Sequence, residues 1–137
     1  MSASLTIALD VMGGDNAPAV VVKGADLARR RFPNIRFRMF GDQALIMPLL
    51  KQRSRLREIT EIMHTENAIS SDMTVSVAIR KGRQSSMQLA IDSVRDGEAE
   101  GIVSAGNAGA LMAMAKLSLR TLPGIHRPAI AAILPSI

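Results

Sequence analysis

The segment from Gly101 to Met114 constrains the fold of this chain most strongly. It begins with the apolar pair Ile102-Val103, continues through four small residues at 104–107 (Ser-Ala-Gly-Asn), and leads into a stretch rich in Ala, Leu and Met at 108–119. A strand that turns through small residues into a helix directs backbone N–H groups at one point, where the helix dipole adds positive potential. The segment therefore predicts either an anion-binding turn or a tight joint whose glycines allow close approach. The residues alone leave both interpretations open.

Apolar runs alternate with helical patterns along the rest of the chain. Periodicity predicts strands over 5–12, 35–40, 56–63, 102–103 and 129–134, and helices over 18–32, 43–50, 85–96 and 108–119. Residues 73–80 alternate between apolar and other side chains and count as a strand by period. The alternation is typical of a parallel sheet covered by helices on both faces.

Polar loops follow three of the predicted strands, at 10–16, 41–42 and 104–107. In parallel sheets ligands bind beyond the carboxyl ends of the strands, so these loops are the candidate site. Gly13-Gly14-Asp15 in the first loop predicts either close approach of backbone to a ligand or a tight turn with a capping aspartate. The segment 81–86 (Lys-Gly-Arg-Gln-Ser-Ser) predicts either a second anion cradle or an exposed basic loop with a helix cap.

Composition limits the classes of protein to which the chain can belong. The chain has 137 residues, of which 47% are hydrophobic and 21% charged, as expected for one globular domain with its own core. It has no cysteine, which excludes disulfides and cysteine nucleophiles and fits a reducing cytoplasm. The net charge of +5 favours an anionic partner, but three Phe and no Trp or Tyr offer few platforms for bases, so no nucleic acid is expected. Neither a signal peptide nor a membrane span is indicated.

The usual catalytic signatures do not occur. The chain has no Gly-x-Gly-x-x-Gly, no P-loop and no Gly-x-Ser-x-Gly elbow. His64 and His126 have no partners at the spacing of metal ligands, so neither a metal nor a cofactor is expected. The chain also stops at Ile137, directly after a predicted strand and without a closing helix, and this predicts either a truncated domain or a short domain that ends in an edge strand.

Several motifs, taken together, resemble the bacterial phosphate acyltransferase family PlsX. The similar segments stand in family order at 7–18 (Ile-Ala-Leu-Asp-Val-Met-Gly-Gly-Asp-Asn-Ala-Pro), 71–72, 78–80, 85–87, 103–112 (Val-Ser-Ala-Gly-Asn-Ala-Gly-Ala-Leu-Met) and 124–129. Ala108 stands where the family usually has Thr, and 81–84 is a variant of the family's basic run. Both departures bear on the affinity for an anion.

The resemblance implies a fold and a reaction. The fold is a Rossmann-like three-layer α/β/α sandwich related to the isocitrate dehydrogenase type, with 1–137 as the N-terminal part of one domain. It also implies a helix rather than a strand at 72–80. The reaction moves a long-chain acyl group from acyl carrier protein to inorganic phosphate in a cytoplasmic homodimer, which other parts of the protein could bring to the inner face of the membrane. The alternatives are a non-catalytic module that binds a phosphorylated ligand and, third, a dehydrogenase half-domain.

The residues expected to carry this chemistry fall into two groups. The catalytic candidates are Asp15, Asn16, Lys81 and Asn107. The candidates for binding phosphate, to which His126 is added at the rim of the site, are Gly13, Gly14, Arg83, Ser85, Ser86, Ser104, Gly106, Gly109 and Arg127. The central expectation is that the turn before Ala108 faces the double glycine and that the two corners grip an oxyanion.

Overall fold

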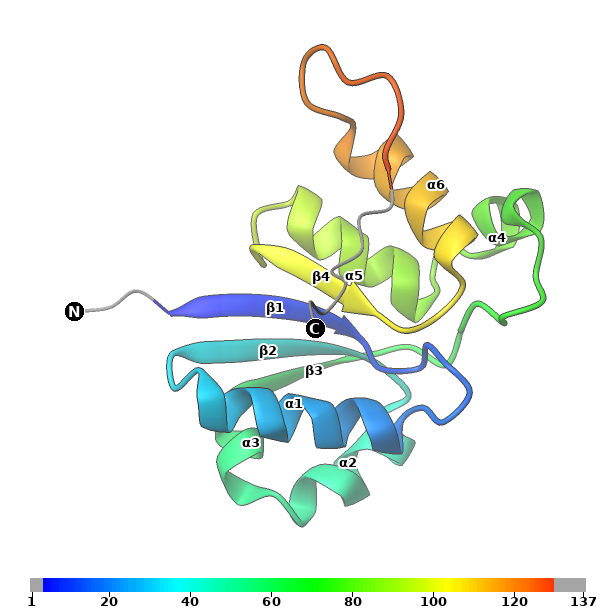
Figure 1. The fold of residues 1–137 in the computed structure, drawn as a ribbon. Helices are drawn as coiled ribbons and strands as arrows, with labels where there is room; N and C mark the ends of the chain where they lie inside the picture. Colours follow the sequence, from blue (N-terminus) through cyan, green and yellow to red (C-terminus); the bar gives the residue numbers. More distant parts are fainter. Residues whose placement is uncertain (1–3, 130–137) are drawn as a thin grey trace, which may run out of the picture.

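The computed structural model describes residues 4–129, which form a sheet of four parallel strands (Figure 1). The strands are β1 (Leu5–Asp10), β2 (Ile35–Gly41), β3 (Thr60–His64) and β4 (Gly101–Ser104), in the order β3-β2-β1-β4. Every neighbouring pair is parallel, so all four carboxyl ends meet at one edge. The predicted parallel α/β fold is confirmed.

Helices pack on both faces of the sheet (Figure 1). On one face lie α1 (Ala19–Arg31), α2 (Gln43–Lys51) and the short α3 (Ser54–Glu58). On the other lie α5 (Ser86–Arg95), which contacts the sheet, α6 (Ala108–Leu119), which packs on α5, and α4 (Val75–Lys81), which packs on α6. The buried side chains Leu9, Met39, Ile46 and Leu56 belong to the first apolar layer, and Met87, Ile91 and Met114 belong to the second.

Two predicted elements differ in the structure. The predicted strand 56–63 begins later, at Thr60, because the residues before it form α3, which turns Leu56 fully into the core. The strand that period predicts at 73–80 is wrong. Thr74 caps a helix there by accepting a hydrogen bond from Val77 N at 3.4 Å, and Ala78 is buried against the second apolar layer. The helix implied by the family resemblance is confirmed.

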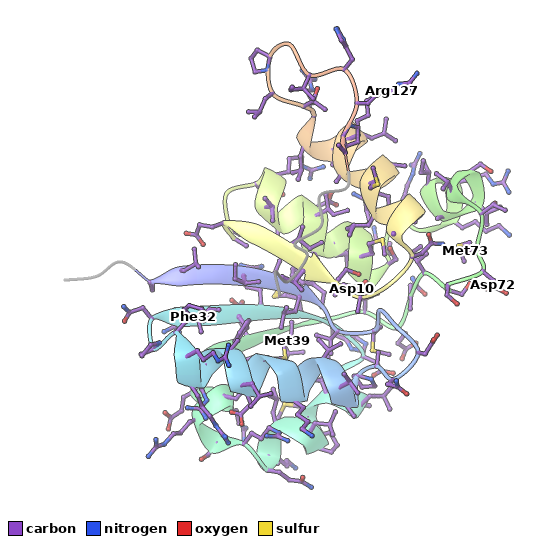
Figure 2. All side chains as sticks on the ribbon, viewed as in Figure 1. Asp10, Phe32, Met39, Asp72, Met73 and Arg127 are labelled. Carbon is purple, nitrogen blue, oxygen red and sulfur yellow. The ribbon has the colours of Figure 1, made fainter. Side chains whose placement is uncertain are left out.

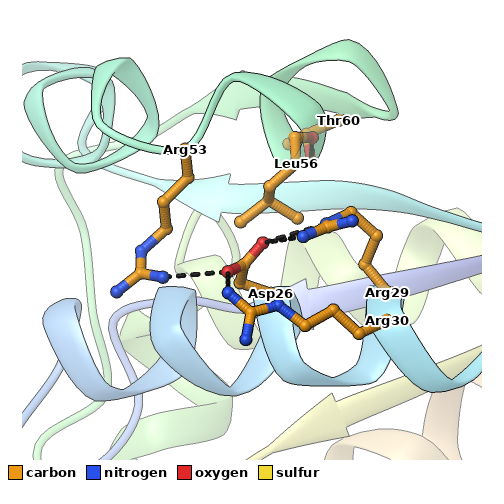
Figure 3. Close-up of polar contacts among 6 residues, drawn as sticks. All are labelled: Asp26, Arg29, Arg30, Arg53, Leu56 and Thr60. Carbon is orange, nitrogen blue, oxygen red and sulfur yellow. Dashed lines mark hydrogen bonds and ion pairs between the residues drawn. The ribbon is translucent and has the colours of Figure 1, made fainter.

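A buried aspartate joins α1 to α3 (Figure 3). The carboxylate of Asp26 accepts hydrogen bonds from Arg29 at 2.9 Å, from Arg30 at 3.3 Å and from Arg53 at 2.9 Å. Burial alone raises the pKa of Asp26, but the hydrogen bonds and charges of these arginines outweigh it and hold the pKa below its ordinary value of 3.8. The three cations therefore compensate the buried charge.

The end of the chain was predicted to contain a further strand. Residues 130–137, which include most of that prediction at 129–134, lie outside the described residues. Before them, residues 122–125 form a turn in which Ile125 N donates to Leu122 O at 3.0 Å. Among the helices of residues 4–129, none combines the length and the apolar character needed to cross a bilayer.

Candidate functional site

Strand register brings the two predicted corners together. Asp10 at the end of β1 pairs with Ser104 at the end of β4, so the loops that follow start side by side. A Cβ atom at Gly13 would lie only 3.0 Å from both Gly106 N and Ser104 Oγ, and one at Gly14, whose φ is +98°, would lie 3.2 Å from Ala105 O. The backbone of one corner therefore approaches the backbone of the other more closely than a side chain at Gly13 would allow.

A cavity of about 300 Å³ opens beside this contact. Three loops form it: the β1–α1 loop, the loop between β3 and α4, and the turn between β4 and α6. Its lining residues are Met12, Gly14, Asp15, Ala68, Ile69, Ser70, Ser71, Ala105 and Gly106. Among these residues there is no Lys, Arg or His, and Asp15 is acidic, so the lining offers an anion no cationic side chain and only the dipole at the start of α6 favours negative charge there.

Asn107 holds two of the three loops in place. Its Oδ1 accepts a hydrogen bond from Ala110 N at 3.1 Å and so caps α6. Its Nδ2 donates to the carbonyl oxygens of Met73 at 2.8 Å and Ser70 at 3.4 Å. The side-chain amide is thus occupied at both ends, which leaves the remaining leading N–H groups of α6 as the unsatisfied donors of the turn.

Asp10 lies beneath the two corners and is 2% exposed. Ser104 Oγ donates to its Oδ2 at 2.8 Å, and Ser86 Oγ donates to its Oδ1 at 2.5 Å. Ser104 Oγ in turn accepts a hydrogen bond from Gly106 N at 3.1 Å. The hydroxyl protons of Ser86 and Ser104 are therefore engaged with a carboxylate inside the protein.

The predicted segment 81–86 adopts the form of a helix cap beside exposed cations. Ser85 Oγ accepts from Gln88 N at 3.2 Å, which caps α5, and donates to Gly82 O at 2.6 Å. Gln88 Nε2 donates to Asp92 Oδ1 at 2.8 Å and does not return to the backbone of Ser85, so the reciprocal half of a capping box does not form. The side chains of Lys81 and Arg83 are exposed, and neither lines the cavity.

The remaining predicted residues lie at different distances from the cavity. Asp15 lines it, and Asn16 is an exposed neighbour in the same loop. Gly109 lies in the first turn of α6, where an added Cβ would come within 3.2 Å of Val75. His126 and Arg127 are exposed on the segment after α6, and Figure 2 shows Arg127 well away from Asp10. The structure thus brings together the corner residues and leaves the basic candidates apart.

Sequence reasoning missed two contributors to the site. Asp10 was not among the candidate residues, although it is the one acid in the predicted strand 5–12 and begins the polar loop 10–16, and a buried carboxylate at a strand end must find donors. Ser70 and Ser71 line the cavity from a loop that no periodic pattern marks. No group of three His, Asp or Glu side chains in residues 4–129 is placed to hold a metal ion.

The fold and the cavity define a class of protein, the parallel α/β proteins that place a ligand site beyond the carboxyl ends of their strands. A family model described as "Fatty acid synthesis protein" matches residues 5–137. Proteins named phosphate acyltransferase in Rhodospirillum rubrum, Rhodospirillum centenum and Paramagnetospirillum magneticum are 58%, 54% and 52% identical to the chain. Each comparison covers 100% of this chain and 39% of the relative. The chain belongs to the PlsX phosphate acyltransferase family and spans about two fifths of the length of these curated relatives.

Proposed function

We propose that the full-length protein transfers a long-chain acyl group from acyl carrier protein to inorganic phosphate and so forms an acyl phosphate for glycerophospholipid synthesis. The observation that carries the proposal is the contact between Gly13 and the turn at Gly106, which opens the cavity beside the start of α6. The names of the relatives support acyl transfer to phosphate. Because the chain covers 39% of these relatives, the proposal concerns the full-length protein and not this segment alone.

The proposed reaction does not need a strong general base in the protein. Inorganic phosphate is largely a dianion near neutral pH, since its second pKa is about 6 by analogy with phosphoesters. One of its oxygens attacks the thioester carbonyl carbon, the carbon–sulfur bond breaks, and the departing thiolate takes up the proton that the phosphate gives up. The site must therefore hold the anion in place and stabilise the oxyanion of the tetrahedral intermediate.

The corner residues suit the first of these tasks. The leading N–H groups of α6, at and beyond Asn107 and up to Gly109, bind the phosphate oxygens, with Ser104 and Gly106 shaping the turn that presents them. Gly13 and Gly14 form the opposite wall, which only residues without side chains allow. Asp15 and Asn16, at the mouth of the same loop, position a polar group of the acyl donor.

The charge of the bound phosphate is neutralised by side chains that do not line the cavity. Lys81 or Arg83 supplies a cation by reaching over the cavity, and Arg127 is a candidate at the rim. The side chains of Ser85 and Ser86 support the start of α5 beneath the site. Because all three basic side chains are exposed and free to extend, their contribution depends on the bound anion and on the rest of the full-length protein.

The wider organisation follows from the same family membership. We propose that residues 1–137 form the N-terminal part of a single Rossmann-like three-layer domain of the isocitrate dehydrogenase type, which assembles as a homodimer. The protein acts in the cytoplasm, and segments outside this chain allow it to associate with the inner face of the membrane. No cofactor is required for direct transfer to phosphate.

The test is an assay of acyl phosphate release by the full-length protein, supplied with long-chain acyl carrier protein and phosphate. Release that requires both substrates supports the proposal. A protein that binds phosphate without turnover would instead be a non-catalytic phosphate-binding module. Saturable binding of NAD would support the dehydrogenase alternative.

A further inference from the structure

Asp10 is a buried carboxylate without a cationic partner. It is 2% exposed, and within residues 4–129 no ion pair joins it to a Lys, Arg or His side chain. Removing a carboxylate from water is costly unless charged hydrogen bonds compensate it. Here two serine hydroxyls and the positive end of α5, whose first residue is Ser86, provide that compensation. Asp26 is also buried but forms ion pairs with three arginines. The contrast indicates that Asp10 has a role other than forming an ion pair.

The charge of Asp10 fixes the direction of a chain of hydrogen bonds. An ionised carboxylate can only accept, so both Ser86 and Ser104 must donate their hydroxyl protons to it. Ser104 Oγ is then left with lone pairs alone, and it accepts the N–H of Gly106 at 3.1 Å. A neutral group at position 10 would allow the Ser104 hydroxyl to rotate and would remove this constraint on the Gly106 peptide.

The Gly106 peptide is part of the cavity wall. It lines the cavity directly, and a Cβ atom at Gly106 would lie 3.3 Å from the Cα of Gly13 in the facing corner. A rotation of this peptide would therefore shift both the wall and the following N–H groups that open α6. The carboxylate controls the shape of the turn from below, without contact with a ligand in the cavity.

We propose that Asp10 is a positioning residue for the anion-binding turn and acts through Ser104 on the Gly106 peptide. This inference rests on the proposed function, because it makes the affinity of that same turn for inorganic phosphate depend on Asp10. The buried carboxylate holds the turn in its binding shape before phosphate arrives, and this lowers the cost of binding.

The test compares two buried aspartates in the full-length protein. Asp10→Asn keeps the size of the side chain and removes its charge, so KM for phosphate should rise about tenfold, the effect of losing one charge-assisted hydrogen bond. KM for acyl carrier protein should change less than about twofold, since the carrier does not use this turn for affinity. The matched control is Asp26→Asn, which removes an equally buried carboxylate on the other face and should lower Tm while leaving KM for phosphate unchanged.

A second variant keeps the inference testable if Asp10→Asn does not fold. Ser104→Ala removes the link between Asp10 and Gly106 and should raise KM for phosphate as much as Asp10→Asn does. In the double variant, KM for phosphate should rise no further than in the more affected single variant, because both substitutions break the same chain of hydrogen bonds. A wild-type KM for phosphate in either single variant, or effects of the two that add in full, would overturn the inference.

Calorimetric titration with inorganic phosphate separates this inference from the proposed function. Wild-type protein that fails to form acyl phosphate refutes the proposed reaction. Phosphate binding that weakens about tenfold in Asp10→Asn still supports the positioning role. Equal phosphate affinity in the wild type and Asp10→Asn, or no phosphate binding by the wild type, contradicts it.

Discussion

The side-chain amide of Asn107 donates a hydrogen bond to the carbonyl oxygen of Met73 at 2.8 Å, across 34 residues of sequence. The same side chain caps α6 through Ala110 N. One residue therefore both ends the turn that opens the helix and fastens the loop before α4 beside it (Figure 2 labels Met73 and Asp72 on that loop). The shape of the cavity depends on this double contact.

Asn107→Ala should remove both contacts. We expect a loss of about 1–2 kcal/mol in the free energy of unfolding, from the missing cap, and a clear fall in acyl phosphate formation by a protein that remains folded. Denaturant unfolding and the transfer assay on the full-length protein measure the two effects. Wild-type turnover in Asn107→Ala would remove this residue from the proposed site.

Asn107→Asp separates capping from tethering. The aspartate keeps an oxygen for Ala110 N but presents its second oxygen to the carbonyls of Met73 and Ser70, which it repels. We therefore expect stability closer to wild type than in Asn107→Ala, together with a similar loss of activity. A variant as active as the wild type would show that the tether to the loop is not needed.

Gly13→Ala should disrupt the contact between the corners. The new Cβ would lie 2.7 Å from Asp10 Oδ2 and 3.0 Å from Gly106 N, and both atoms are held by hydrogen bonds to Ser104 Oγ. We expect a loss of at least about 2 kcal/mol in unfolding free energy and little remaining transfer activity. Gly24→Ala is the matched control, because a Cβ there meets nothing within 4 Å and helical alanine is favoured by about 0.5–1 kcal/mol. Equal behaviour of the two variants would contradict the close approach at Gly13.

Much of the fold could be predicted from the sequence because the central strands β1 and β2 are largely buried and the helices carry apolar side chains at helical spacing. Residues 35–40 and 102–103 were correctly assigned from continuous or alternating apolar patterns, and α6 begins and ends at the predicted residues 108 and 119. Short helices were the exception. In α3 a single buried residue, Leu56, between exposed arginines carries no helical period, and tertiary packing decides the conformation.

Only the backbone of the site, and not the partners of its side chains, could be predicted from the sequence. Glycines at 13, 14 and 106 marked where the chain must come close, and the register of parallel strands placed them together. The hydroxyls of Ser85, Ser86 and Ser104 were expected to face an anion, but the sequence cannot show that Gly82 O and Asp10 lie nearer and accept their protons. The contact of Ser85 with Gly82 is local, but those of Ser86 and Ser104 with Asp10 join residues 76 and 94 positions apart, beyond any local pattern.

The buried Asp26 predicts how stability responds to acid. Its pKa lies below 3.8 in the folded protein, so its stabilising charge is fully present above that pH and is lost as the pH falls through the folded pKa. Asp26→Asn should therefore lower the unfolding free energy by about 1–3 kcal/mol at pH 7, and the difference from wild type should shrink below about pH 4. Denaturant titrations at the two pH values measure this.

Asp96→Asn is the control for that experiment. A hydrogen bond from Arg95 lowers the pKa of Asp96, but both side chains are about half exposed, and exposed pairs contribute little. We expect its stability to match the wild type at both pH values. A constant difference between Asp26→Asn and wild type from pH 7 to pH 3 would contradict the role of the Asp26 charge.

The distribution of charge predicts how the carrier approaches. Residues 26–36 and 51–58 hold eight Lys or Arg and two acids, at the edge of the sheet opposite the cavity, while the whole chain has a net charge of +5. Charges this far from the site act by long-range attraction of an acidic protein and not by contact. Arg55→Gln with Arg57→Gln should lower kcat/KM for acyl carrier protein at low salt, and the difference from wild type should vanish near 1 M salt, where screening acts within about 3 Å. An effect that persists at high salt would indicate direct contact instead.

The most direct test is a crystal structure of the full-length protein with inorganic phosphate. We expect phosphate in the cavity between the Gly13-Gly14 corner and the start of α6, with backbone N–H groups of the turn at about 3 Å from its oxygens. Phosphate bound elsewhere, or a cavity filled by aliphatic side chains from the remainder of the protein, would contradict it.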